Sequence, residues 1–341
     1  MNKVNEDKPM KSSVILLCLH VICVNALSVS LFPLKAQIQL SPLNSKGSFI
    51  EGKDKVLMPV IEGKDLREHY SLDERAIALS TIAVTPNGTQ FEAVMLPATL
   101  TLFEQAIQSF EIRGLDTEIF IVPHQMPSKE PKNPETYSPH VVIGTDERLP
   151  ITDTRVRPHL YNGKIDTGCT GTLISPLHVL TAGHCVSDGE GQWYRELDFT
   201  AGQNGNDKPW ETMTWKKVMT TTAWHTQRDY NFDYALIVLD DAPHGGHSGW
   251  GTYSDGLHSV TGYPADKSWR TMWTDSGETS SSTYRVCYTL DTSGGQSGSG
   301  IKDERGYVRG VHTTGALSQN CGTRLTSTVF TMLQNWMAAT P

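Results

Sequence analysis

The sequence lacks any cluster of basic side chains. It carries 29 Lys and Arg residues against 37 Asp and Glu residues, which gives a formal net charge of −8 over 341 residues. Because contacts to phosphates need clustered Lys and Arg, this composition disfavours nucleic-acid binding. Apolar residues make up 38% of the chain, which is enough to bury a core and disfavours a wholly disordered protein.

The sequence also has no CxxC pair, so a structural zinc site has little support, and we expect neither a metal nor an organic cofactor. The apolar run Val14–Val24 is too short to span a bilayer comfortably. It follows three lysines and precedes small or apolar residues at Val24–Ala26. This pattern is typical of a secretory signal peptide, and we assign it to residues 1–26. An N-terminal membrane anchor is the alternative.

Cysteine is scarce, and four of the six residues remain once residues 1–26 are removed. An even number of cysteines in a secreted chain predicts two disulfides, although the pairing is open. Pairing sequence neighbours gives Cys169–Cys185 and Cys287–Cys321. Each disulfide would add about 3 kcal/mol to the free energy of unfolding, because it lowers the entropy of the unfolded chain by closing a loop.

The pattern of apolar and turn-forming residues changes near residue 141. Within residues 27–140, the stretch 100–114 predicts an amphipathic helix that ends at Gly114. Residues 123–140 are rich in proline and predict an exposed linker that is open to proteolysis. Residues 141–341 hold short β-branched runs between Gly, Pro, Asn and Asp, and only the end, "VFTMLQNWM", looks helical. This spacing predicts a single all-β unit built of two barrels.

Three short stretches could together form a catalytic site. His184 follows an apolar strand and a turn of small residues in "VLTAGHC". Asp233 opens the apolar strand Ala235–Leu239, where a buried carboxylate would need a partner such as an imidazole N–H. Asp229, Asp240 and Asp241 are competitors, but they lie on polar flanks and are typical of solvated turn charges.

The third stretch is "GGQSGSG", which contains Ser297. The glycines before it let successive backbone N–H groups converge, so we expect Gly295 and Ser297 to form an oxyanion hole. The pattern is not G-x-S-x-G, which excludes an α/β-hydrolase nucleophile elbow. Ser293 and Ser299 are alternative nucleophiles without the paired glycines at the right offset.

The stretches "TGTLISPLHVLTAGHC", "DYALIVL" and "GGQSGSG" resemble the signature blocks of chymotrypsin-like serine proteases. More narrowly, "VVIGTDER", "TGYPADK" and "DTSGGQSGSG" resemble the bacterial-type glutamyl endopeptidases. The resemblance covers Val141–Trp336. It implies two six-stranded antiparallel β-barrels with a C-terminal helix over residues 141–341. Residues 27–140 carry no such resemblance and occupy the place of a propeptide.

Two hypotheses concern the substrate side chain. Asp291 lies six residues before Ser297, where trypsin-like relatives hold the acid that selects Arg or Lys. His312, fifteen residues after Ser297, and Thr292, five before it, match the positions that bind the substrate carboxylate in glutamyl endopeptidases. A Glu carboxylate that leaves water for a pocket needs several hydrogen-bond donors there. The resemblance implies a third donor, the α-amino group of Val141 that is released when the propeptide is removed. The uncut chain would lack this donor and would therefore be latent.

We therefore expect a secreted serine endopeptidase, extracellular or periplasmic, that is made as a zymogen and cleaves after Glu or Asp. Its partners would be protein or peptide substrates and its own propeptide, with no nucleic acid and no membrane after processing. The alternatives are a trypsin-like protease that uses Asp291 and a non-catalytic binding protein with a protease fold.

Overall fold

The computed structural model describes residues 38–56, 58–61, 66–112 and 142–339, and all of them belong to one unit, Leu34–Pro341. The predicted signal peptide, residues 1–26, and the predicted linker, residues 123–140, lie outside the described residues. No helix in the described part of the chain is long and apolar enough to cross a membrane.

Nine strands form the larger sheet, in the order β1–β4–β3–β11–β12–β8–β7–β6–β10. Neighbours are antiparallel throughout. Strand β12 is buried at every residue, which explains its uninterrupted apolar sequence. The bounds are β1 Ser41–Lys46, β3 Thr81–Val84, β4 Thr89–Ala93, β6 Asn162–Ile165, β7 Thr170–Ser175, β8 His178–Thr181, β10 Phe199–Ala201, β11 Trp215–Thr221 and β12 Ala235–Leu239.

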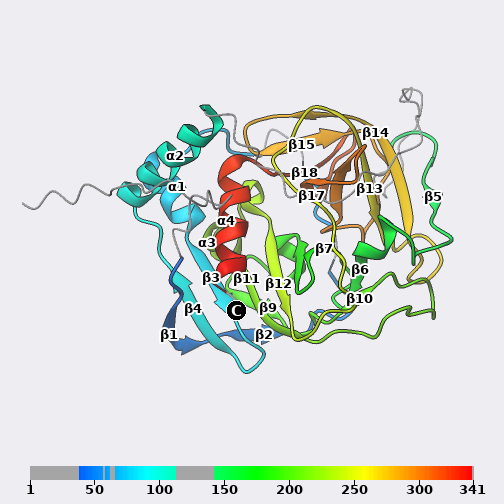
Figure 1. Cartoon of the computed structure of the whole chain (residues 1–341), viewed down its shortest axis with the longest axis horizontal. Helices are drawn as coiled ribbons and strands as arrows, with labels where there is room; N and C mark the ends of the chain where they lie inside the picture. Colours follow the sequence, from blue (N-terminus) through cyan, green and yellow to red (C-terminus); the bar gives the residue numbers. More distant parts are fainter. Residues whose placement is uncertain (1–37, 57, 62–65, 113–141, 340–341) are drawn as a thin grey trace, which may run out of the picture. The chain divides into compact units, whose positions relative to one another are not determined.

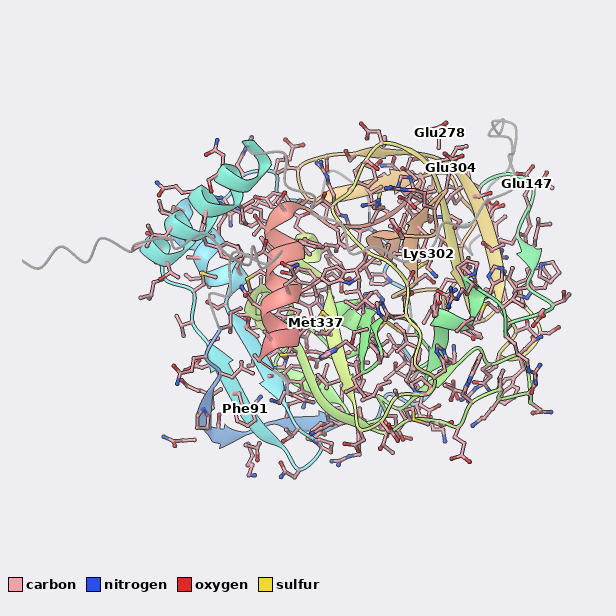
Figure 2. The ribbon with its side chains drawn as sticks, in the orientation of Figure 1. Phe91, Glu147, Glu278, Lys302, Glu304 and Met337 are labelled. Carbon is pink, nitrogen blue, oxygen red and sulfur yellow. A yellow bond between two sulfur atoms is a disulfide. The ribbon has the colours of Figure 1, made fainter. Side chains whose placement is uncertain are left out.

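Seven antiparallel strands form the second sheet, in the order β13–β16–β17–β18–β15–β14–β5, and pairing of β13 with β14 closes six of them into a barrel. Figure 2 shows Lys302 of β16 among packed side chains, whereas Glu278 and Glu304 lie at the edge of this barrel. The bounds are β5 Leu149–Pro150, β13 Gly256–Gly262, β14 Trp273–Ser281, β15 Arg285–Tyr288, β16 Gly300–Asp303, β17 Val308–Gly315 and β18 Asn320–Arg324.

Helices and 3₁₀ turns lie between the strands and after the last of them. The helices are α1 Leu72–Leu79, α2 Pro97–Ile112, α3 Thr222–Gln227 and α4 Ser327–Ala338. The 3₁₀ turns are η2 His159–Tyr161, η3 Gly183–Cys185 and η4 Tyr230–Phe232, and β2 Ser48–Ile50 pairs in parallel with β9 Gln192–Tyr194. The predicted all-β fold with a C-terminal helix is confirmed, and so is a helix close to residues 100–114, which is α2.

The upstream segment is part of the larger sheet, which the sequence did not indicate. Figure 1 shows β3 and β4 beside β11, on the side of the molecule where α1, α2 and α4 gather. Val84 and Ala83 of β3 face Val218 and Met219 of β11 across the ladder. An exposed β11 would present unpaired backbone groups at a sheet edge, and β3 covers that edge. The Trp336 indole on α4 also donates to Thr81 Oγ1 at 2.8 Å.

Candidate active site

His184 is held by Asp233 through two contacts. The backbone N–H of His184 donates to Asp233 Oδ1 at 2.8 Å, and His184 Nδ1 lies 2.7 Å from Oδ2. A carboxylate only accepts hydrogen bonds, so Nδ1 carries the proton and Nε2 is left as the basic nitrogen. Only glycine fits at position 183, because a Cβ there would lie 2.6 Å from the Trp224 ring and 3.0 Å from Asp233 Oδ1. Asp233 is fully buried, directly after the η4 turn and two residues before β12.

The competing carboxylates are engaged elsewhere. Asp229 accepts from the Tyr70 hydroxyl at 2.8 Å, and Asp240 accepts from Thr214 Oγ1 at 2.8 Å. Asp241 accepts from the backbone N–H of the next residue. Of the four carboxylates considered, Asp233 is the one that contacts the imidazole.

The loop that carries Ser297 packs on the ends of β7 and β8. The Ser297 carbonyl accepts from the Thr170 N–H at 2.8 Å, and a Cβ on Gly298 would lie 2.1 Å from Thr181 Oγ1. The Cys169–Cys185 disulfide joins the residue before Thr170 to the residue after His184. The fold thus brings the loop of Ser297 against the strand end that precedes His184.

Ser297 Oγ and His184 Nε2 are both buried, and neither has a hydrogen-bond partner within the described residues. The structure therefore leaves a hydrogen bond between the two groups unmade. Such contacts are often long in the absence of substrate and tighten only in the complex.

The backbone around Ser297 is suited to an oxyanion hole. Gly295 has φ +93°, and a Cβ there would lie 2.4 Å from the Tyr263 carbonyl oxygen, so only glycine fits. Between residues that the structure describes, neither the Gly295 N–H nor the Ser297 N–H donates to a protein acceptor. Ser299 is less suitable as a nucleophile, because its hydroxyl packs tightly against Gly262 of β13. Ser293 hydrogen-bonds Asp266 instead.

His312 lies fully buried on β17, with Nδ1 2.7 Å from Tyr288 Oη and Nε2 3.1 Å from Met58 Sδ. Burial, helped by His184 and Arg285, lowers the pKa of His312 to about 3, so the ring is neutral. A thioether sulfur only accepts, so Nε2 carries the proton and the Tyr288 hydroxyl donates to Nδ1. Burial raises the pKa of Tyr288, which keeps that hydroxyl protonated.

Two further buried polar groups are Thr292, which the sequence resemblance assigned to the pocket, and Arg285, whose charge helps to lower the pKa of His312. The Thr292 hydroxyl is buried and has no hydrogen-bond partner among the described residues. Arg285 is buried and donates to the Tyr230 carbonyl and to Thr314 Oγ1. Burial lowers the pKa of Arg285 to about 10, which still leaves a positive charge near the pocket at neutral pH. Sequence reasoning missed Arg285, Tyr288 and Met58, since no motif marks them.

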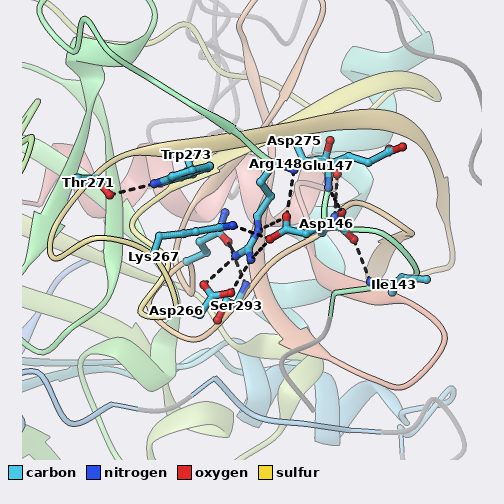
Figure 3. A network of polar contacts seen from close by, with 12 residues as sticks. Ile143, Asp146, Glu147, Arg148, Asp266, Lys267, Thr271, Trp273, Asp275 and Ser293 are labelled. Atoms are coloured by element: carbon cyan, nitrogen blue, oxygen red, sulfur yellow. Dashed lines mark hydrogen bonds and ion pairs between the residues drawn. The ribbon is translucent and has the colours of Figure 1, made fainter. Parts of the chain in front are cut away.

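Asp291 binds the backbone of the segment that follows the predicted linker. Its two oxygens accept from the Ile143 N–H at 2.9 Å and the Glu147 N–H at 2.8 Å. Figure 3 shows the adjoining network, in which Arg148 lies between Asp146 and Asp266. Val141, the predicted new N-terminus, lies outside the described residues.

Both disulfides join the expected pairs. Cys169 bonds Cys185 with an S–S distance of 2.05 Å, and Cys287 bonds Cys321 with 2.09 Å. In the described ranges, the one group of three close metal-ligating residues is Cys169, His184 and Cys185. Its two sulfurs are joined to each other, so it offers no thiolate to a metal ion.

Comparisons with known proteins identify the family. Residues 169–311 match the trypsin-like peptidase domain. The chain is 37% identical over 227 residues to the extracellular metalloprotease of Bacillus subtilis (strain 168), covering 60% of this chain and 72% of that protein. It is 35% identical over 233 residues to the glutamyl endopeptidase of Bacillus licheniformis, covering 62% and 72%. The chain belongs to the chymotrypsin-like serine proteases.

A solved structure of a Glu endopeptidase in complex with MPD agrees with this assignment. It matches the protease with a TM-score of 0.55 at 26% identity, over 58% of this chain and 99% of that one. The family expected from the three sequence blocks is therefore confirmed.

Proposed function

We propose that this protease is a secreted serine endopeptidase, made as a zymogen, that cleaves peptide bonds after Glu or Asp. The observation that carries the catalytic part is the double contact between His184 and Asp233, next to the loop of Ser297. The signal-like residues 1–26, the two disulfides and the extracellular relative support secretion. Protein or peptide substrates follow from the family.

In the proposed mechanism Ser297 Oγ attacks the substrate carbonyl carbon and its proton passes to His184 Nε2. The oxygen that becomes negative is held by the N–H groups of Gly295 and Ser297. The C–N bond then breaks, and His184 gives its proton to the leaving nitrogen. Water repeats these steps on the acyl-enzyme and releases the acid, while Asp233 holds the imidazole in place.

Selection of Glu is supported by the chemistry around His312. A neutral imidazole with its proton on Nε2 can donate to a carboxylate, and the buried Thr292 hydroxyl, which the resemblance assigns to the same pocket, would be a second donor. Arg285 adds a fixed positive charge close to His312. These groups offset the loss of water by an entering carboxylate, whereas a substrate cation would meet only like charge and donors.

The trypsin-like alternative would require Asp291 to bind a substrate cation. Both of its oxygens already accept backbone N–H groups, so its role here is to hold the segment around Ile143. The α-amino group of Val141, a further donor in our proposal, would be released a short distance along the same segment.

Peptides that differ only at the residue before the scissile bond test this function. The processed protease, with its N-terminus verified by mass spectrometry, should cleave the Glu peptide fastest, then Asp, and leave Arg and Phe largely intact. A preference for Arg would favour the Asp291 alternative. Labelling of Ser297 by a serine-directed phosphonate, absent in Ser297→Ala, separates a protease from a non-catalytic binding protein.

A further inference from the structure

The upstream residues 54–56 and 58–61 run along the candidate active site. The Asp54 N–H donates to the Asp166 carbonyl at 2.8 Å, and the Val56 N–H donates to the Thr167 carbonyl at 3.1 Å. The segment is thereby fixed to the loop that precedes Cys169. A Cβ on Gly168 would lie 3.2 Å from Asp54 Cα, so this contact is close.

Further along, the same segment reaches the candidate specificity site. Met58 is 8% exposed, and its sulfur lies 3.1 Å from His312 Nε2. Its neighbours then pair with the end of β17. The Gly315 N–H donates to the Pro59 carbonyl at 2.9 Å, and the Ile61 N–H donates to the Gly315 carbonyl at 2.8 Å. This pattern is a parallel bridge between Val60 and Gly315.

The direction in which a substrate lies follows from the proposed function, on which this inference rests. His184 must protonate the leaving nitrogen, so the half of the substrate after the scissile bond lies on the His184 side. The Cys169–Cys185 disulfide ties that side to the loop of Asp166 and Gly168. The half before the scissile bond therefore passes along β17, from Gly315 toward His312.

The upstream segment runs the opposite way. It passes Asp166 first, His312 next and Gly315 last. With Met58 against His312, the peptide nitrogen that follows it points along β17 and away from His184. The following residue is Pro59, whose nitrogen carries no hydrogen and whose ring fixes the backbone. A chain held in this way fills the substrate groove without offering a bond that the site can cut.

We infer that residues 54–56 and 58–61 act as a built-in inhibitor bound in reverse across the substrate groove, with Met58 as the side chain that blocks the acidic-residue pocket. A neutral thioether suits this position, because it accepts from Nε2–H without bringing a charge that would need desolvation. The inhibitor and the substrate compete for the same backbone groups of Gly315.

Phosphonate labelling of Ser297 in the uncut, full-length chain tests the blocking role. Met58→Ala should raise the labelling rate about tenfold or more, since truncating a buried methionine removes a substantial part of its binding energy. Met95→Ala is the matched control, because Met95 is a 9% exposed upstream methionine that packs elsewhere. Unchanged labelling in Met58→Ala, or an equal rise in both variants, overturns the inhibitor. If the processed wild-type protease is not labelled either, the proposed function fails instead.

A second experiment tests the direction of binding. The double substitution Met58→Glu with Pro59→Ala places a cleavable Glu-Ala bond at the pocket of the uncut chain. Reverse binding predicts that mass spectrometry finds this bond intact in the folded chain. A synthetic peptide of residues 52–61 with the same two changes should be cut by the processed protease, since a free peptide can bind in either direction. Cleavage of the uncut double variant between positions 58 and 59 would show substrate-like binding and overturn the reversed orientation.

Discussion

Tyr288 Oη lies 2.7 Å from His312 Nδ1, and the two residues come from β15 and β17, the two strands of the closed barrel that flank β18. The hydroxyl fixes which nitrogen of a neutral imidazole carries the proton. In this arrangement Nε2–H is directed at the space that Met58 occupies in the uncut chain. In the function that we propose, Tyr288 would therefore position His312 for substrate selection.

Tyr288→Phe should lower kcat/KM for a Glu peptide about tenfold, because His312 loses the donor that holds its proton on Nε2. The loss should be much smaller for a Phe peptide, whose weak cleavage does not depend on that proton. Tyr234→Phe is the matched control, since the buried Tyr234 hydroxyl has no partner among the described residues. Equal losses on both peptides would assign Tyr288 a structural role only.

Asp233→Asn should reduce kcat by about 10⁴-fold, because an amide that donates to His184 Nδ1 selects the wrong tautomer. Single-turnover cleavage of a Glu peptide by the processed protease measures this loss. Asp240→Asn changes an exposed carboxylate that bonds Thr214 and should leave kcat unchanged. Full activity of Asp233→Asn would remove Asp233 from the triad.

The family and the residues of the candidate triad could be predicted because each lies in a short local motif. The glycines around Ser297 indicate an unusual backbone at that residue, and the apolar strand after Asp233 indicates that its carboxylate is buried. Arg285, Tyr288 and Met58 could not be predicted, because their importance depends on contacts between distant segments. Met58 and His312 are 254 positions apart in the sequence, and no motif near either residue predicts their contact. Likewise, the pairing of β3 with β11 depends on two strands that alone look like ordinary β-branched runs.

Three buried histidines should make the folded chain lose stability as pH falls below about 6.5. Burial lowers the pKa of His178 and His225 to about 4 and that of His312 to about 3, from the ordinary value of 6.5. Between these values the unfolded chain binds more protons than the folded one, so unfolding is favoured as pH falls. Each histidine contributes up to ~1.4 kcal/mol per pH unit in that window.

Urea unfolding of Ser297→Ala between pH 7 and pH 4.5 measures this slope without self-digestion. His178→Gln should remove the contribution of one histidine to the pH dependence of the free energy of unfolding. The Ser175 hydroxyl can still bond the new side chain, so the fold should be kept. A free energy of unfolding that stays flat over this interval would contradict the buried neutral histidines. Paired carboxylates such as Asp146, whose pKa Arg148 holds below its usual range, add to the slope only at the acid end of this interval, below about pH 5.

Lys302→Met should stabilise the fold at neutral and acidic pH. Lys302 is 2% exposed between the second barrel and the larger sheet, and its ammonium donates to Asn162 Oδ1 of β6 at 2.8 Å. Burial lowers its pKa to about 7 from 10.5, so the charged form is costly in the folded state. Methionine fills a similar volume without that charge, and a gain of about 1–4 kcal/mol is expected for such replacements.

The pH dependence of this gain tests its cause. Below pH 7 the lysine is charged in both states and the cost of burial is complete, whereas between pH 7 and pH 10.5 only the unfolded lysine holds its proton. The stability difference between Lys302→Met and the wild-type side chain should therefore shrink as pH rises through this window. Thermal unfolding in the Ser297→Ala background measures it, with Lys302→Ala as the control that removes the charge but leaves a cavity. A difference that is constant from pH 6 to pH 10 would mean that packing, and not the buried charge, sets the stability at this position.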